Sequence, residues 1–148
     1  MKKGFTLIEL LAVIIILAIL MIIAVPNILS TLATARQQAF VTQAQSIYKA
    51  AEQQYTISSM KNEYHSCFGK GATNAELDLG SISSSLNYYV AFNSNGQITA
   101  IQVYDSGQSL AISLPASGTS VVPQNAINSA AVTTGSISVT QCVANAQP

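Results

Sequence analysis

Hydrophobic residues are concentrated in one segment near the start of the 148-residue chain. Residues 5–25 hold 19 apolar residues out of 21, and only Thr6 and Glu9 interrupt the run. A helix needs about 20 apolar residues to cross the hydrocarbon core of a bilayer. The pattern therefore predicts one membrane-spanning helix over residues 5–25.

After Pro26 the pattern becomes amphipathic and indicates that the helix continues to about residue 57. Apolar residues recur every three or four positions and form one stripe, made of Phe40, Ala44, Ile47, Tyr48, Ala51 and Tyr55. We expect this stripe to pack on the core of the chain's own globular head. Pro26 lacks a backbone N–H donor, so we expect it to kink or loosen the helix locally.

Short alternating runs later in the chain predict a small antiparallel sheet of about four strands. Residues 88–92 and 98–104 flank the turn sequence Asn93-Ser94-Asn95-Gly96, a strong hairpin signal. Residues 110–114 predict a third strand, and residues 137–141 predict a fourth. A long helix on such a sheet is an α+β fold.

Two details of this prediction concern side-chain direction and connections. In the strand over residues 98–104, strict alternation places Ile101 and Val103 on one face and Ile98 on the other. Residues 58–86, which include the serine-rich run 81–85, read as an irregular connection, and so do residues 115–134. The serine-rich run is expected to be a solvated loop, with O-linked modification as the alternative.

The charge pattern disfavours two classes of protein. Six basic and six acidic residues give a net charge of zero, and charged residues make up 8% of the chain against about 25% in an ordinary soluble domain. Without a basic cluster, we expect no direct nucleic-acid site. An ordinary cytosolic enzyme is also disfavoured.

Two simpler interpretations of the apolar segment remain open. A secretory signal peptide has an apolar core of only about 7–15 residues, and the cleavage-like Ala33-Thr34-Ala35 lies beyond the run. A plain single-span anchor fits the length. Lys2 and Lys3 on the short side place the N-terminus in the cytoplasm and the rest of the chain outside.

Glu9 is the feature that a plain anchor does not explain. A carboxylate in a transmembrane helix costs a few kcal/mol and is usually paired, yet the predicted helix has no other charge. Its partner must be an interface group, another chain or a new charge. Cleavage after Gly4 would give Phe5 a free ammonium group, which can neutralise Glu9 of a neighbouring copy.

The sequence Gly4-Phe5-Thr6-Leu7-Ile8-Glu9, after a short basic leader and before an unbroken apolar helix, resembles the processing motif of type IV pilins. Pro26 also stands where these proteins commonly have a proline. The resemblance covers residues 1 to about 57 closely, and the remainder only in general layout. It implies the pilin fold, a long helix on a small antiparallel sheet.

The resemblance also implies how the chain is processed and divided. A prepilin peptidase would remove residues 1–4 by cutting between Gly4 and Phe5, and would N-methylate Phe5. Residues 5–25 would form the membrane helix and later the filament core. Residues 26–148 would form the extracytoplasmic head, which includes the second half of the helix.

The family's partners follow from the same resemblance. An assembly ATPase and a platform protein would move identical subunits from the cytoplasmic membrane into a surface filament. A pseudopilin of a type II secretion or competence system is the nearest alternative, and a minor pilin is another. From a different class, a membrane-anchored binding protein would keep its leader and stay monomeric.

Cys67 and Cys142 both lie outside the membrane in this orientation, so we expect a disulfide between them. Pilins often bridge two cysteines around a C-terminal loop. Here the first cysteine precedes the predicted sheet, which departs from that pattern, and two free buried thiols are the alternative.

No enzymatic activity, cofactor or metal is predicted. His65 is the only histidine and has no second donor at ligand spacing. Glu76, Asp78 and Asp105 are weak candidates for calcium because no Asp-rich and Gly-containing loop accompanies them. The sequence shows no Ser-His-Asp order, phosphate-binding loop or catalytic carboxylate pair.

Overall fold

The computed structural model describes residues 4–72, 75–80, 84–115 and 121–143. The chain divides into two compact units, residues 1–36 and residues 37–148. We call them the N-terminal unit and the head unit. The leader residues 1–3, residues 81–83 of the serine-rich run and residues 116–120 of the second predicted connection lie outside the described residues.

One helix, α1 (Leu7–Met60), runs through both units and ends three residues beyond the predicted limit. In the head unit its predicted apolar stripe is confirmed. Phe40, Ala44, Ile47 and Ala51 are fully buried, and the ring of Tyr55 packs against the same core. The membrane-length segment and the stripe are thus parts of one continuous helix.

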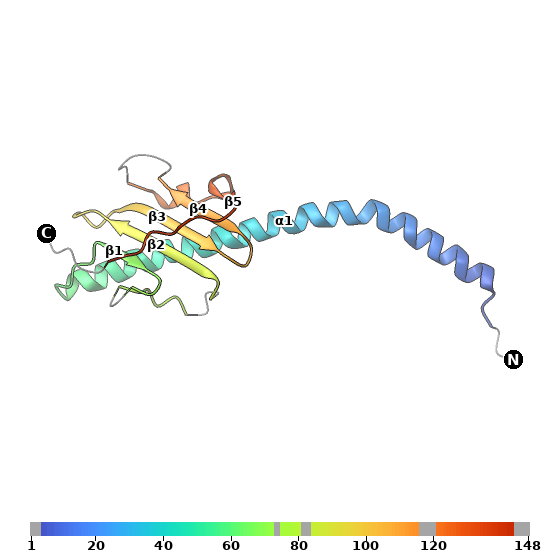
Figure 1. Ribbon diagram of the computed structural model, residues 1–148, viewed down its shortest axis with the longest axis horizontal. Helices are drawn as coiled ribbons and strands as arrows, with labels where there is room; N and C mark the ends of the chain where they lie inside the picture. Colours follow the sequence, from blue (N-terminus) through green and yellow to red (C-terminus); the bar gives the residue numbers. More distant parts are fainter. Residues whose placement is uncertain (1–3, 73–74, 81–83, 116–120, 144–148) are drawn as a thin grey trace. The chain divides into compact units, whose positions relative to one another are not determined.

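The α+β prediction is confirmed by an antiparallel sheet of five strands in the order β1-β2-β3-β4-β5. The strands are β1 (Cys67–Gly69), β2 (Leu86–Phe92), β3 (Ile98–Asp105), β4 (Leu110–Leu114) and β5 (Thr133–Thr134). Figure 1 shows α1 behind this sheet in the head unit. Alternate residues of β2 face the helix, namely Leu86, Tyr88, Val90 and Phe92.

The prediction for Ile98 is wrong because β3 is irregular at its start. The pairing register with β2 shifts between Ala91 and Phe92, so that Ala91 pairs with Ala100 but Phe92 pairs with Ile98. Such a bulge inserts one residue and resets the side-chain alternation. Ile98, Ile101 and Val103 are therefore all buried in the one core.

Both segments that the sequence predicts to be irregular connections contain short regular elements. Residues 58–86 include β1, which has only three residues. Residues 115–134 include β5 and two short 3-10 helices, η1 (Gln124–Ala126) and η2 (Ser129–Ala131). Val122 and Ile127 from this region are buried, and the hydroxyl of Tyr48 on α1 donates to the Val122 carbonyl over 2.9 Å.

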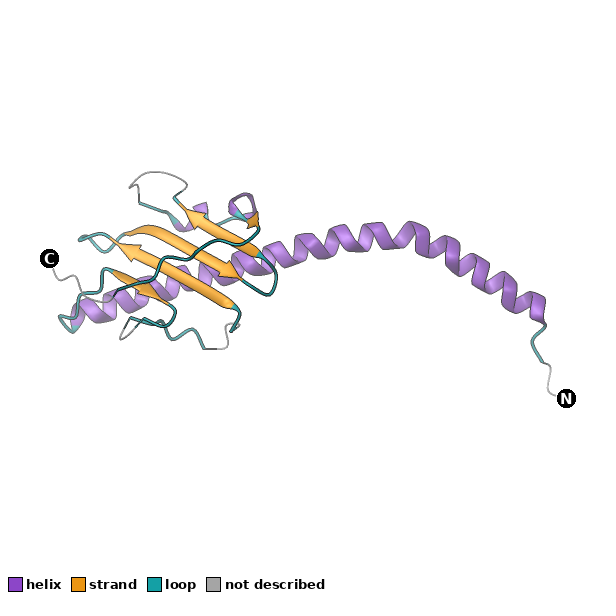
Figure 2. Cartoon of the chain, in the orientation of Figure 1, coloured by secondary structure: helices purple, strands orange, loops and turns teal. Residues whose placement is uncertain are grey.

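The strand predicted over residues 137–141 is also wrong. These residues belong to a segment without regular secondary structure, residues 135–143, which we call the strap. Ile137 and Val139 are half-buried between exposed neighbours, so the alternation that suggested a strand is present. Figure 2 shows the strap as a loop that crosses the strands on the side away from α1.

The strap crosses the sheet because its two ends are fixed at opposite edges. It leaves β5 at one edge, and Cys142 is bonded to Cys67 of β1 at the other. Four interstrand spacings amount to about 19 Å, and eight extended residues reach about 26 Å. The strap therefore uses roughly three quarters of its full reach to cross the sheet. Its direction across the strands prevents it from pairing as one of them.

Candidate functional site

The predicted cleavage junction lies in open chain just before α1 begins. Gly4, Phe5 and Thr6 have no regular secondary structure, and α1 starts at Leu7. Apart from the residues next to it in the chain, no described residue has an atom within 4 Å of the position that a Cβ on Gly4 would occupy. Phe5 is 90% exposed. A peptidase can therefore approach the Gly4–Phe5 peptide bond without unfolding any helix.

Thr6 and Glu9 form a capping box at the first turn of α1. The backbone N–H and the hydroxyl of Thr6 donate to Oε2 of Glu9 over 2.9 and 2.8 Å. In return, the backbone N–H of Glu9 donates to the Thr6 hydroxyl over 3.4 Å. Such reciprocal bonds satisfy backbone donors that a helix start leaves without partners.

The capping box gives Glu9 a hydrogen-bond partner within its own chain, in addition to the partners that the sequence analysis expects. The signal was present, because a Thr three residues before a Glu and ahead of an apolar run is typical of a helix start. A hydrogen-bonded carboxylate is still an anion, however. The capping box does not replace the opposite charge that a carboxylate in an apolar environment requires.

The surface that follows is apolar and uncovered. All side chains from Leu7 to Val25 are exposed, and α1 is long and apolar enough at its N-terminal end to cross a membrane. The helix continues through Pro26 without a break. Beyond it, the hydroxyls of Ser30 and Thr31 both donate to the Asn27 carbonyl, over 3.0 and 2.9 Å.

Residues 1–25 match the prokaryotic N-terminal methylation motif. This motif is the class III leader of type IV pilins, and it marks precursors that are structural proteins. The predicted resemblance of the N-terminus is therefore confirmed, and residues 1–25 are similar to the start of type IV pilin-like and pseudopilin precursors. Comparisons with curated proteins and with solved structures gave no match.

The two cysteines form a disulfide, Cys67–Cys142, which closes a sequence separation of 75 residues. The bond connects β1 with the strap. A Cβ added to Gly69 would lie 3.0 Å from Cβ of Cys142, so the glycine allows the strap to approach β1 closely. The bridge thus fixes the end of the strap, and the free-thiol alternative does not describe this structure.

The side chains considered for metal binding have other surroundings. The His65 ring lies 5.6 Å from the Phe68 ring. Asp105 is buried at the end of β3. Its Oδ1 accepts hydrogen bonds from the Ser85 hydroxyl over 2.7 Å and from the Gly107 N–H over 2.8 Å. Among the described residues, no group of three His, Cys, Asp or Glu side chains is placed to hold a metal ion.

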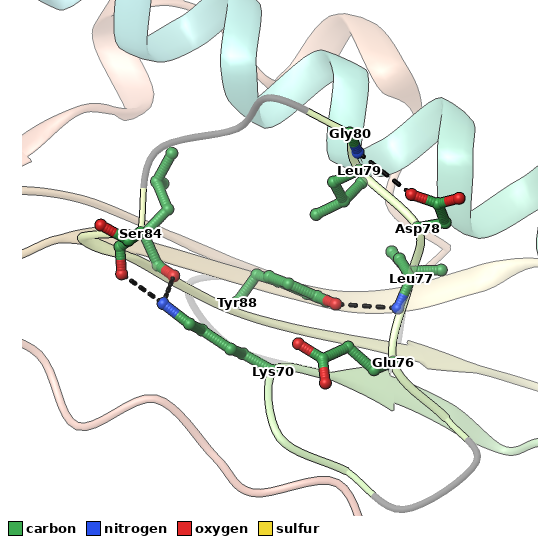
Figure 3. A pocket seen from close by; sticks show the side chains of 9 residues that line it. Lys70, Glu76, Leu77, Asp78, Leu79, Gly80, Ser84 and Tyr88 are labelled. Atoms are coloured by element: carbon green, nitrogen blue, oxygen red, sulfur yellow. Dashed lines mark hydrogen bonds between the residues drawn. The ribbon is translucent and has the colours of Figure 1, made fainter.

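Glu76 and Asp78 instead line a pocket of about 240 Å³ beside β2, shown in Figure 3. Two residues that line it are joined by a hydrogen bond: the Tyr88 hydroxyl accepts from the Leu77 N–H over 2.9 Å. Burial raises the pKa of Tyr88 above its usual value and the charge of Glu76 adds to this, while the Leu77 bond acts in the opposite direction. Lys70 Nζ donates to the carbonyls of Ser84 and Leu86 at the rim.

Proposed function

We propose that this protein is the structural subunit of a type IV pilus, a helical surface filament. The observation that carries the proposal is the match of residues 1–25 to the methylation motif, together with the exposed apolar surface that follows it. An uncovered apolar helix requires lipid or other apolar helices around it. Packing against identical helices in a filament core meets that requirement outside the membrane.

In this proposal a prepilin peptidase cuts between Gly4 and Phe5 and methylates the new amino group of Phe5. The open chain around Gly4 supports cleavage at that bond. The processed chain then consists of a core helix, residues 5–25, and an extracytoplasmic head from residue 26 onward. This head includes the second half of α1 and the whole head unit. An assembly platform and its ATPase then extract the subunit from the cytoplasmic membrane into the extracellular filament.

Glu9 has the assembly role in this mechanism. Its carboxylate pairs with the positively charged amino group of Phe5 on the adjacent subunit and so fixes the register of each addition. The capping box supports this role because it orients the Glu9 side chain toward the helix start.

Pro26 is the proposed position of a kink that lets the helix adapt between membrane and filament.

Electron microscopy of fibres sheared from cells, with mass spectrometry of their subunit, tests the proposal. We expect long filaments composed of a chain that begins with methylated Phe5. A processed chain confined to short membrane-associated structures would indicate the pseudopilin alternative. A processed chain present as a trace component of filaments made from another subunit would indicate a minor pilin. An intact leader that retains Lys2 and Lys3 would contradict the whole proposal.

A further inference from the structure

The strap and the outer face of the sheet enclose a second hollow, of about 270 Å³. It differs from the pocket of Figure 3 in having no carboxylate in its wall. Its walls come from three parts of the head unit. They are Lys70 after β1, residues of β2 and β3 (Asn87, Tyr88 and Tyr104), and residues of the strap (Ile137, Val139, Thr140 and Gln141).

The polar side chains of this hollow have unused hydrogen-bonding capacity. Within the described residues, the side chains of Asn87, Tyr104, Thr140 and Gln141 make no hydrogen bond to the protein. The strap is held at this point by its backbone instead, because the Thr140 N–H donates to Oε1 of Gln102 over 2.8 Å. Two amides and two hydroxyls therefore remain available to a ligand.

The chemistry of these groups defines the ligand class. Amide and hydroxyl groups are neutral and both donate and accept, which suits a ligand rich in hydroxyl groups. The Tyr104 ring supplies an apolar surface beside them. The ammonium of Lys70 already donates to two backbone carbonyls, which disfavours an anion as the main ligand.

We propose that this hollow, which we call the strap groove, binds a neutral saccharide. An extended peptide is a poorer candidate, because peptides add to a sheet through an open edge, whereas the strap groove lies on a face. The Cys67–Cys142 bond holds one wall, so the groove depends on the disulfide. A single groove of this size gives weak binding. In an array of identical subunits, many grooves would act together and raise the avidity.

Saturation-transfer NMR on the full-length protein tests this inference, in micelles of a detergent without a sugar head group. The probes are lactose, maltose, chitobiose and the anionic sialyllactose. We expect signal transfer to at least one of the neutral disaccharides. The Tyr104→Ala variant should bind that sugar about tenfold more weakly, equivalent to ~1.4 kcal/mol. Reduction of the disulfide should also weaken binding.

Two further variants separate the groove from general effects. Tyr64→Ala removes a tyrosine that is 63% exposed outside the groove and should leave saccharide affinity unchanged. Gln141→Ala alters an exposed strap side chain and should weaken binding without lowering stability. The inference is overturned by absence of transfer to every neutral probe, by unchanged affinity in Tyr104→Ala, or by preferential binding of sialyllactose over lactose. None of these outcomes depends on whether the protein forms filaments.

Discussion

At two glycines, Gly96 and Gly4, we expect an added side chain to have a large effect. Gly96 closes the turn between β2 and β3 with a φ of +77°, and an added Cβ would lie 2.6 Å from Cε1 of Tyr55 on α1. The Tyr55 ring is itself stacked on Phe92, with 4.7 Å between centroids. The hairpin turn therefore rests directly on the helix, and this contact leaves no room for a side chain.

Replacement of Gly96 should separate two costs of adding a side chain. We expect Gly96→Ala to lower the free energy of unfolding by about 2–3 kcal/mol, since backbone strain of about 1–2 kcal/mol adds to displacement of the Tyr55 ring. Gly71→Ala is the control, because Gly71 has a φ of +74° but no atom of the described residues lies within 4 Å of an added Cβ. Chemical denaturation of both variants checks the difference. Equal losses would show that the ring moves aside at no cost.

Gly4 matters for a different reason, because no part of the described structure crowds it. We expect Gly4→Val to abolish leader removal while leaving the head unit folded, since a branched side chain beside the scissile bond blocks close approach of a peptidase to the backbone. Mass spectrometry of the membrane fraction measures the leader directly. A shortened and methylated chain from this variant would contradict cleavage at Gly4–Phe5.

At the level of elements, the strap shows what the sequence could and could not predict. The long helix and the β2–β3 hairpin follow from local patterns, a stripe at helical spacing and a turn sequence between alternating runs. The half-buried Ile137 and Val139 give the same local pattern as a strand. Their placement across the sheet depends on where β5 and the disulfide lie, which is a non-local property. β1 was missed because three residues carry no periodicity.

The candidate sites also differ in whether a local sequence pattern is enough to predict them. Gly4, Phe5 and Glu9 lie within one six-residue motif, residues 4–9, so a local pattern is enough to predict them as site residues. The hydrogen bond of Thr6 to Glu9 also follows from a local spacing. The strap groove was not readable. Asn87, Tyr104 and Gln141 come from three separate segments, and only the folded sheet with its strap brings them together.

The disulfide provides an element-level prediction. We expect Cys67→Ser and Cys142→Ser to lower the free energy of unfolding equally, and the double variant to be no less stable than either, because each removes the same bond. The chain-entropy model gives about 4.5 kcal/mol for a loop of this length. Thermal or chemical unfolding of the three variants measures it. Additive losses would mean that each side chain contributes independently of the bond.

At the scale of the whole molecule, Glu9 is the residue to which we assign both a role in the single chain and a role in the proposed filament. In the isolated chain it is a cap that stabilises the start of α1. In the proposed filament it also neutralises the amino group of a neighbouring Phe5. These two roles depend on different properties of the same side chain. The cap needs an acceptor oxygen, whereas the intersubunit pair needs a negative charge.

Two substitutions distinguish these roles. Glu9→Gln keeps an acceptor for Thr6, since glutamine also serves at this position of a capping box, but it removes the charge. Glu9→Ala removes both. If the charge pair drives assembly, both variants should reach the membrane at normal levels yet form few or no filaments, because an unpaired buried charge costs about 3–5 kcal/mol at each subunit addition. Immunoblots of membrane fractions and fibre counts by electron microscopy provide the two readouts. Wild-type filament numbers from Glu9→Gln cells, with a defect only in Glu9→Ala, would assign Glu9 to the cap alone and remove the salt bridge from the assembly mechanism.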